Sequence, residues 1–182
     1  LYQDDHRYFL HNPKTFVFII VDGINLLGSK EDIDEVSLLL ADSRDKFGFS
    51  PVVITQQNRA QGDIQRVKLH GSDMTPQLED VYKTSQCSFD CDVAIGIFDP
   101  YRYKAVNKFG SYFGYQIVGH PPQGSMMHPR GFSRFRSCHI LKNNFGMDGA
   151  MYGLRFTGES GHFETLPLPD TVELDQIYSE IM

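Results

Sequence analysis

Two short apolar runs on either side of one amphipathic segment constrain the fold most strongly. The run FVFIIV at 16–21 is continuous, rich in β-branched residues, and followed by Asp22. This pattern predicts a strand that is buried on both faces, as in a parallel sheet. The segment 31–47 has helical periodicity, with acidic residues in its first turn and basic residues in its last. PVVIT at 51–55 predicts a second buried strand, so the three elements form a βαβ unit.

The remainder of the chain predicts more sheet. DVAIGIF at 92–98 is expected to be a third buried strand. Three later segments, joined by glycine-containing turns, are predicted strands: 136–142, 151–157 and 161–167. Two further helices are predicted, at 77–87 and 171–181. We therefore expect one α/β domain over 1–182 that finishes in antiparallel strands.

Composition favours a cytoplasmic globular protein. The chain has 182 residues, and 41% of them are hydrophobic, which is enough for the core of one domain. Its apolar runs are far shorter than the roughly 20 residues of a membrane helix, and its first residues are polar, unlike a signal peptide. Three cysteines, an odd number, argue against a disulfide framework. The start at Leu1 rather than Met suggests a fragment of a longer protein.

Charge is distributed very unevenly along the chain. The net charge is −6, yet 101–147 contains seven Lys or Arg residues and no Asp or Glu, so the remainder carries −13. The same segment is rich in aromatic residues, and glycines and prolines break its part at 101–135 too often for a regular element. We interpret it as a basic, aromatic insertion that binds an anionic partner such as nucleic acid. The alternative is that its basic residues pair with the acidic remainder of the domain.

Three polar residues follow predicted strands. Asp22 ends the first strand, and open α/β sheets bind ligands at the carboxyl ends of their strands. In nucleotide hydrolases an Asp at this place holds the Mg²⁺ of a bound triphosphate. Gln56 follows the second strand and can sense a γ-phosphate, while Lys142 ends a later strand and can reach a neighbouring subunit's phosphate. The alternatives are a turn start at Asp22, a polar loop at Gln56 and a solvated strand end at Lys142.

Taken together, in this order and spacing, these features resemble RecA-like P-loop ATPases, and most of all the DnaB-type replicative DNA helicases. FVFIIVDGINLL resembles the Walker B strand, with Asp22 on its magnesium-binding aspartate. EVSLLLADSRDKFGFSPVVITQQNR resembles the helix and strand that lead to the family's glutamine motif, where Gln56 matches the glutamine. CDVAIGIFDPYRY resembles the next core strand, and HILKNNFGMDGAMYGLRFTGESGHFE resembles the final hairpin. The resemblance covers roughly 16–166, the C-terminal half of the ATPase domain from Walker B onward.

The resemblance implies a RecA-like, mostly parallel central sheet flanked by helices and finished by an antiparallel hairpin. It implies ATP with Mg²⁺ as cofactor, a homo-oligomeric ring, single-stranded DNA as partner and no membrane. The activity would be ATP hydrolysis coupled to DNA binding, in a helicase or in a DNA repair or recombination motor. Asp22, Gln56 and Lys142 would be catalytic, and Asp22, Lys142 and Asn144 would bind the nucleotide. The DNA-binding residues would be basic side chains from two segments: Arg59, Arg66, Lys68, Arg130, Arg134 and Arg136.

The sequence also departs from the family pattern. No G-x-x-x-x-G-K-[ST] motif occurs in the 182 residues, so we expect this chain alone to bind ATP poorly and to be inactive. Asn144 stands where the family has its arginine finger, and a finger contributes several powers of ten in rate. Hydrolysis would then be slow, or Arg130, Arg134 or Arg136 would replace the finger.

These departures leave two other functions open. The first is a degenerate, non-catalytic RecA-like domain that serves as a nucleic-acid or protein docking module. The second is a small-molecule α/β enzyme, if the resemblance is accidental.

Overall fold

The computed structural model describes a set of segments with gaps: residues 2–4, 7–9, 14–56, 75–80, 85–103, 105, 111–117 and 134–169. The chain divides into two compact units. The first contains Leu1–Gln61 and Leu78–Asp92, and the second contains Gly62–Gln77 and Val93–Met182. The organisation as one domain over 1–182, with an insertion at 101–135, stays a prediction.

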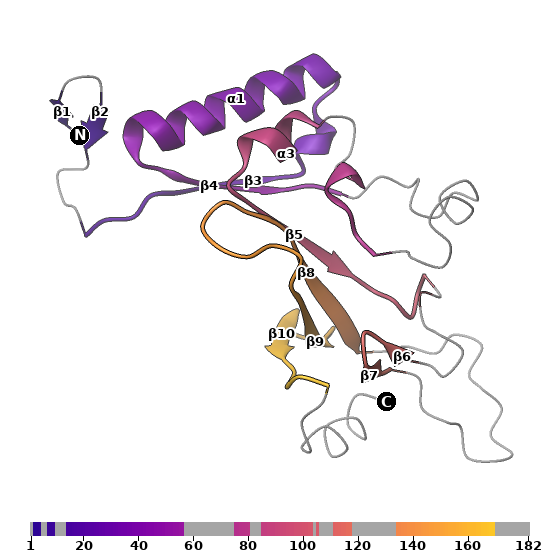
Figure 1. Ribbon diagram of the computed structural model, residues 1–182. Helices are drawn as coiled ribbons and strands as arrows, with labels where there is room; N and C mark the ends of the chain where they lie inside the picture. Colours follow the sequence, from indigo (N-terminus) through magenta and orange to yellow (C-terminus); the bar gives the residue numbers. More distant parts are fainter. Residues whose placement is uncertain are drawn as a thin grey trace, which may run out of the picture. The chain divides into compact units, whose positions relative to one another are not determined.

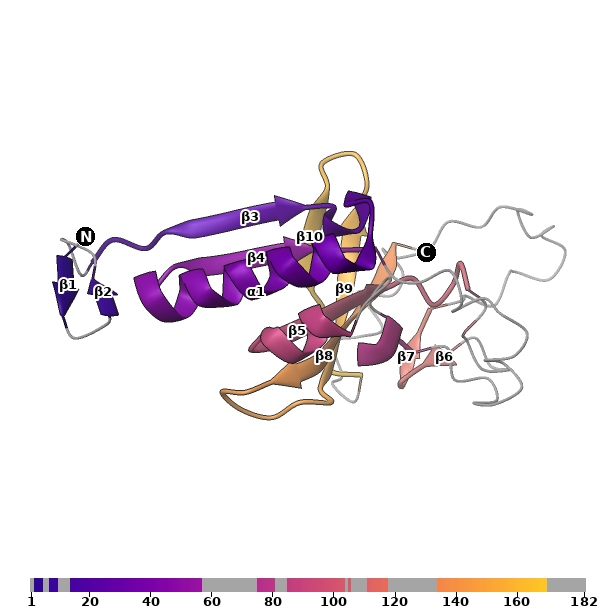
Figure 2. The ribbon, with the colours of Figure 1, turned by 90° about the horizontal axis from the view of Figure 1, so that it is seen from above.

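The first unit is built on the predicted βαβ unit. Strands β3 (Phe18–Asp22) and β4 (Ser50–Ile54) pair in parallel, and the helix α1 (Lys30–Phe47) connects them after a short 3₁₀ turn, η1 (Ile24–Leu26). Figures 1 and 2 show α1 running alongside the two strands. The predicted strand, helix and strand are confirmed within one or two residues at their ends.

The other elements of the first unit are short. β1 (Tyr2–Asp4) and β2 (Arg7–Phe9) form an antiparallel pair. The prediction of one helix at 77–87 is wrong for the described residues of this region. They form a 3₁₀ turn, η3 (Leu78–Asp80), and a short helix, α3 (Gln86–Asp90). No helix among the described segments is long and apolar enough to cross a membrane.

Local hydrogen bonds explain why α1 begins and ends where it does. The Ser29 hydroxyl accepts a hydrogen bond from the Asp32 backbone N–H at 3.0 Å, and the Asp32 carboxylate accepts one from the Ser29 N–H at 3.1 Å. This capping box satisfies two backbone donors, and hydrogen bonding to Ser29 lowers the pKa of Asp32. At the other end Gly48 takes a left-handed φ of 68° and donates to the Arg44 carbonyl. Sequence signals within one turn therefore fix both ends of the helix.

The two strands of the first unit are not buried on both faces as predicted. Phe18 and Ile20 of β3 are 63% and 69% exposed, and Val52 and Ile54 of the neighbouring β4 are exposed as well. Ile19, which alternates with the two exposed residues of β3, is partly covered. The physical reason is that a single helix can cover at most one face of a two-stranded sheet. The described part of this unit holds no second layer that could cover the other face.

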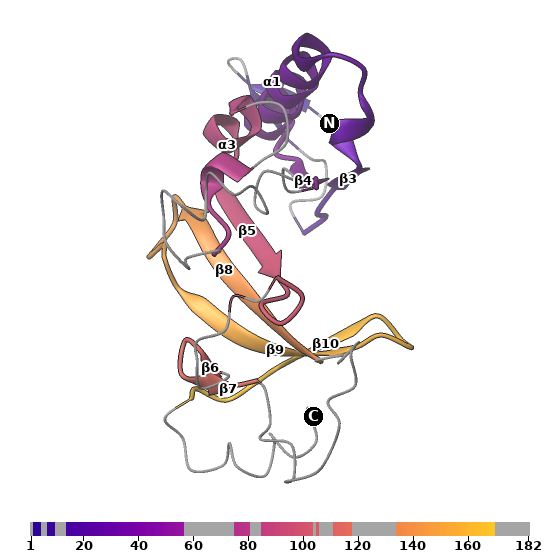
Figure 3. The same ribbon diagram turned by 90° about the vertical axis from the view of Figure 1, so that its right-hand side faces the viewer.

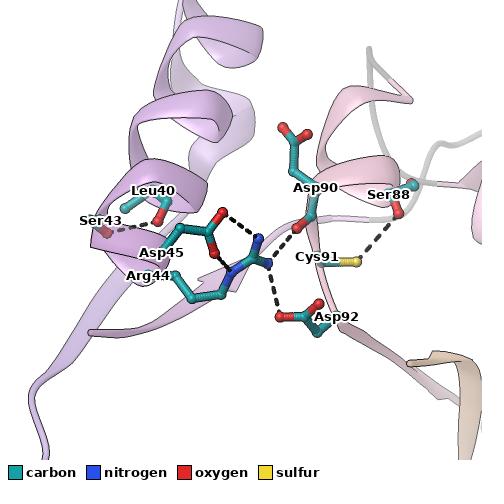
Figure 4. A network of polar contacts seen from close by, with 8 residues as sticks. All are labelled: Leu40, Ser43, Arg44, Asp45, Ser88, Asp90, Cys91 and Asp92. Atoms are coloured by element: carbon teal, nitrogen blue, oxygen red, sulfur yellow. Dashed lines mark hydrogen bonds and ion pairs between the residues drawn. The ribbon is translucent and has the colours of Figure 1, made fainter. Parts of the chain in front are cut away.

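One arginine ties the end of α1 to the end of α3. Arg44 Nη1 donates to the Asp90 carbonyl and to Asp92 Oδ2, both at 2.8 Å, and Nε donates to Asp45 Oδ1 at 2.8 Å. Figure 4 shows the guanidinium between these acceptors. Hydrogen bonding to Asp45 is the main cause that raises the pKa of Arg44; burial opposes it, and the charges of Asp45 and Asp92 add to the increase. The Ser37 hydroxyl adds a hydrogen bond to Asp90 at 2.6 Å.

We expect Arg44→Gln to lower the free energy of unfolding by about 1–2 kcal/mol, because hydrogen bonds to a charged group are lost while their acceptors stay partly buried. Urea unfolding measures this loss. Lys46→Gln is the matched control, since its ion pair with Asp42 on the same helix is more than half exposed and should contribute only a few tenths of a kcal/mol. Equal losses in both variants would contradict the role given to Arg44.

The second unit is an antiparallel sheet in the order β10-β9-β8-β5 (Figure 3). Its strands are β5 (Val93–Phe98), β8 (Phe135–Asn143), β9 (Met151–Thr157) and β10 (His162–Thr165). All four predicted strands and the antiparallel finish are confirmed. The fold of the described residues is therefore a mixed α/β structure with a parallel strand pair, a four-stranded antiparallel sheet and two short antiparallel pairs. Among the described residues, parallel pairing is limited to β3 and β4, because β5 pairs antiparallel with β8, so the predicted parallel central sheet is found only in part.

Two other expectations for this unit are wrong. β5 is not buried on both faces, since Val93, Ile95 and Ile97 are all exposed. The segment 101–135 is not wholly irregular, because β6 (Ser111–Tyr112) and β7 (Tyr115–Gln116) form a hairpin within it. Two-residue loops that end in glycine favour such hairpins, and Phe-Gly supplies one here.

Aromatic residues of the basic segment build the core of this unit. The buried cluster consists of Phe98, Tyr112, Tyr115, Ile117, Phe135 and Leu166. The Tyr115 ring lies against Gly153 of β9, and its hydroxyl donates to the Pro167 carbonyl at 3.0 Å. Part of the aromatic content that we interpreted as surface is therefore interior, since three of these rings fill the space beside the sheet.

Candidate nucleotide site at the strand ends

The parallel pairing brings two of the predicted site residues to one edge of the first unit. Asp22 is the last residue of β3 and lies opposite Ile54, the last residue of β4. The Gly23 N–H donates to the Ile54 carbonyl at 3.0 Å and holds the two strand ends together. Gln56 follows β4 by two residues, and both Asp22 and Gln56 are exposed. A carboxylate and an amide therefore lie at the same sheet edge in contact with solvent.

Glycine allows the chain to turn immediately after Asp22. Gly23 has φ 77°, in the left-handed region that residues with a Cβ avoid. A Cβ at Gly23 would also lie 3.0 Å from Leu26 Cδ1. The backbone then enters η1, where the Leu26 N–H donates to the Gly23 carbonyl at 2.8 Å. The turn leaves Asp22 at the end of the strand, with the following backbone folded away from it.

This edge suits a magnesium nucleotide better than a protein-bound metal. Mg²⁺ usually takes one or two carboxylates and fills its remaining positions with water and phosphate oxygens. A single exposed carboxylate, Asp22, fits that requirement. In the parts of the chain that the structure describes, no group of three or more His, Cys, Asp or Glu residues can hold a metal ion. A cation at Asp22 would therefore take most of its ligands from the nucleotide and water.

The second unit carries the other two predicted nucleotide-binding residues on one hairpin. Lys142 lies near the end of β8 opposite Ala94, beside an irregularity in the pairing with β5, and is half-buried. Asn144 is exposed in the turn that follows β8. Asn143 orders this turn, because its side chain accepts from the Phe145 N–H at 3.1 Å and donates to the Met147 carbonyl at 3.2 Å. The roles of Lys142 and Asn144 at a nucleotide stay predictions.

Only two of the six predicted DNA-binding residues belong to the described residues. Arg134 is exposed at the start of β8. Arg136 is 14% exposed, forms an ion pair with Asp99 at 3.1 Å and lies over the Phe156 ring at 5.2 Å. Its guanidinium is thus engaged within its own unit. The others lie outside the described residues, and all six assignments stay predictions: Arg59, Arg66, Lys68 and Arg130.

Two aromatic side chains of the basic segment, Tyr103 and Phe113, are exposed in the second unit. Phe113 occupies the loop of the β6–β7 hairpin, and Tyr103 follows the end of β5. The Phe-Gly dipeptide flanked by Tyr residues is the sequence signal that could have located the hairpin. No local pattern separates these exposed rings from the buried Tyr112 and Tyr115, because burial depends on the long-range packing of β8 and β9.

Comparison with known proteins gives structural likeness without sequence likeness. No protein-family model and no curated protein matches the chain. A solved structure of a DnaB-like replicative helicase, studied with its interactions with primase, is similar with a TM-score of 0.56 and 19% identity. A second solved structure, of an ATPase domain, is similar with a TM-score of 0.55 and 19% identity.

Both likenesses extend over most of this chain but over a minority of the other. They cover 86% of this chain, 32% of the helicase chain and 46% of the ATPase-domain chain. The chain thus spans less than half the length of the structures that it resembles. Together with the βαβ unit and the closing antiparallel strands, the likeness shows that this chain shares its fold with part of the DnaB-like replicative helicase and part of the ATPase domain.

Proposed function

We propose that this chain is the C-terminal part of a DnaB/RecA-like ATPase domain that couples ATP hydrolysis to single-stranded DNA binding. The motor would be a helicase or a DNA repair or recombination ATPase. The observation that carries the proposal is the placement of Asp22 and Gln56 at one edge of a parallel strand pair. The DnaB-type fold supports it, because open α/β sheets bind ligands at this edge.

Asp22 and Gln56 have distinct roles in this proposal. Asp22 holds the Mg²⁺ of ATP, and the bound ion supplies charge neutralisation to the transferring phosphoryl group. The Gln56 amide contacts the γ-phosphate through a hydrogen bond and distinguishes ATP from ADP. The chain continues from Gln56 to Arg59, Arg66 and Lys68, so a change at Gln56 can reach the proposed DNA contacts. Each such contact with a phosphate would make DNA affinity fall with added salt.

The β8–β9 hairpin completes the site of a neighbouring subunit in this proposal. In a homo-oligomeric ring, Lys142 would approach the neighbour's nucleotide together with Asn144. A neutral amide at Asn144 cannot neutralise the charge that develops on the phosphoryl group. Turnover is therefore slow, or an arginine of the same segment, Arg130, Arg134 or Arg136, supplies the missing charge.

Gln56→Ala tests the coupling. In an ATPase polypeptide that carries residues 1–182 together with a phosphate-binding loop, we expect the ATP turnover of the variant to lose its stimulation by single-stranded DNA. The reason is that the amide links the γ-phosphate to the DNA contacts. Steady-state phosphate release with and without DNA measures this. Gln57→Ala, the neighbouring amide in the sequence, is the matched control, and unchanged stimulation in Gln56→Ala would contradict the proposal.

The second candidate function is a non-catalytic docking module for nucleic acid or protein. Two observations favour it: Asn144 stands at the position of the arginine finger, and the basic, aromatic insertion at 101–135 is longer than the usual connection in the family that the sequence resembles. The same experiment separates the two functions, because a docking module would show no turnover and would bind DNA equally well as the native chain and as the Gln56→Ala variant.

A further inference from the structure

The β6–β7 hairpin holds an aromatic residue in a strained backbone conformation. Phe113 has φ 48° and the following Gly114 has φ 84°, so both loop residues are left-handed. Two-residue loops of this kind strongly prefer Asn or Asp before the glycine. A bulky side chain in the left-handed region is a genuine outlier and costs free energy. Folding alone would favour another residue at position 113.

The strained residue also keeps its ring in solvent. The Phe113 side chain is 57% exposed, so core packing does not account for its presence. Its inner edge is fixed by edge-on contacts with Tyr112, at a centroid distance of 4.8 Å, and with His139, at 5.9 Å. The ring is therefore held in place while much of its surface remains available.

A second exposed ring belongs to the same aromatic cluster. Tyr112 contacts Phe98 at 6.0 Å, and Phe98 stacks on Tyr103 at 5.3 Å with an interplanar angle of 16°. Tyr103 is 42% exposed, and the guanidinium of the exposed Arg102 lies 5.9 Å from its ring centroid. The buried rings of Tyr112 and Phe98 thus link Phe113 to a second ring that has a cation beside it.

The charge of this region indicates what the rings can bind. They lie in the segment 101–147, which carries seven basic and no acidic residues. The positive charge of this segment attracts anions, and exposed aromatic rings can stack on planar, unpaired bases. Single-stranded nucleic acid offers both features on one molecule. Charge alone would also suit an acidic protein, whereas single-stranded nucleic acid accounts for both the positive charge and the two exposed rings.

We propose that Phe113 and Tyr103 form a base-stacking platform for single-stranded nucleic acid, with Arg102 contacting its phosphates. Because it assigns a contact surface to the motor's single-stranded DNA, this inference rests on the proposed function. The platform consists of other residues than Arg59, Arg66 and Lys68, which the resemblance implies for DNA binding. A functional requirement for an aromatic ring at the loop explains why the chain retains Phe rather than Asn at position 113.

The test uses the 182-residue chain and a fluorescein-labelled oligothymidylate of about 15 nucleotides, a length that can occupy one binding site. Fluorescence anisotropy is expected to show affinity about 5- to 150-fold lower for Phe113→Asn, as for the loss of one stacked base. The thermal midpoint should stay the same or rise by about 2–4 °C, because Asn adopts the left-handed conformation more readily. Unchanged affinity, or a lowered midpoint that accompanies the lost affinity, would overturn the proposal.

Two further comparisons separate stacking from charge. An oligonucleotide of abasic sites with the same length should bind the native chain more weakly, and Phe113→Asn should then make no further difference. Arg102→Gln should reduce the slope of log affinity against log salt by about 0.7, whereas Phe113→Asn should leave the slope unchanged. Equal affinity of the native chain for the thymidylate and abasic oligonucleotides would exclude base stacking.

Phe163→Ala is the matched control. Phe163 is an exposed aromatic residue of β10 that packs on Phe156 at 4.8 Å and lies outside the basic segment. Its replacement should lower stability and leave DNA affinity unchanged. The binding assay needs no ATP, and turnover is measured separately in the polypeptide that carries residues 1–182 with a phosphate-binding loop. Phe113-dependent binding without DNA-stimulated turnover in that polypeptide would refute the motor and keep the platform. Stimulated turnover with no effect of Phe113→Asn would refute the platform and keep the motor.

Discussion

Replacing Asp22 by Asn is expected to lower ATP turnover at least about 100-fold, because the variant loses the negative charge that positions Mg²⁺ on the phosphates. Asn has almost the same shape as Asp, and Asp22 is exposed at the end of β3, so the fold should not change. The measurement is steady-state phosphate release at saturating MgATP, in a polypeptide that carries residues 1–182 with a phosphate-binding loop. A higher Mg²⁺ requirement should accompany the lost rate.

The control for this prediction is Asp42→Asn. Asp42 is an exposed carboxylate of the same unit that pairs with Lys46 on α1, far along the chain from the strand end. Its replacement removes the same charge from the protein and should leave turnover within about twofold of the native value, since surface ion pairs contribute little. If Asp22→Asn and Asp42→Asn keep equal turnover, Asp22 does not hold the metal and the nucleotide site lies elsewhere.

Gly153→Ala is expected to destabilise the protein by about 2–3 kcal/mol, because its methyl group would overlap the ring of Tyr115. A Cβ at Gly153 would lie 2.7 Å from Tyr115 Cζ and 3.0 Å from Phe135 Cε2. Both rings are fully buried, so neither can move aside without disturbing the cluster. For a chain of this size the thermal midpoint should fall by about 4–12 °C, which calorimetry or urea unfolding can measure.

A control and a rescue variant make this second prediction specific. Gly28→Ala adds the same methyl group where the nearest atom, Asp32 Oδ2, is 3.8 Å away, so its effect should be small. Tyr115→Leu removes part of the ring that blocks Gly153 and its hydrogen bond to Pro167, so it should cost stability by itself. In the Tyr115→Leu background, however, Gly153→Ala should cost less. Equal stability of Gly153→Ala and Gly28→Ala would mean that the ring yields freely.

The sequence predicted the secondary structure of this chain well where the signals are local. The capping box at Ser29 and Asp32 and the left-handed Gly48 set the ends of α1, and all of these residues lie within one turn of the helix ends. The meeting of Asp22 and Gln56 at one edge also follows from the sequence. A βαβ connection makes its strands parallel, and polar residues that follow parallel strands share an edge.

What surrounds each strand depended on tertiary structure. Apolar runs indicate that a strand can be buried, but the covering layer comes from elsewhere in the chain. In the described first unit, apolar side chains of both β3 and β4 remain exposed. The antiparallel pairing of β5 with β8 joins residues more than 35 positions apart, and no local pattern encodes that partner. A similar separation in sequence lies between Asp99 and Arg136, whose ion pair makes a predicted DNA contact part of the fold.

The aromatic residues of 101–147 show most clearly what the sequence predicts and what depends on tertiary structure. Their number and the surrounding basic charge are sequence properties, and they were sufficient to predict an anionic partner. Tertiary structure determines which rings are buried. Tyr115 is buried because its ring packs against Gly153 of β9, whereas Phe113 is exposed because it lies in the hairpin loop. The physical reason is the separation in sequence of the interacting residues. Turns and helix ends depend on hydrogen bonds between neighbouring residues, whereas the burial of a side chain depends on which distant segment packs against it.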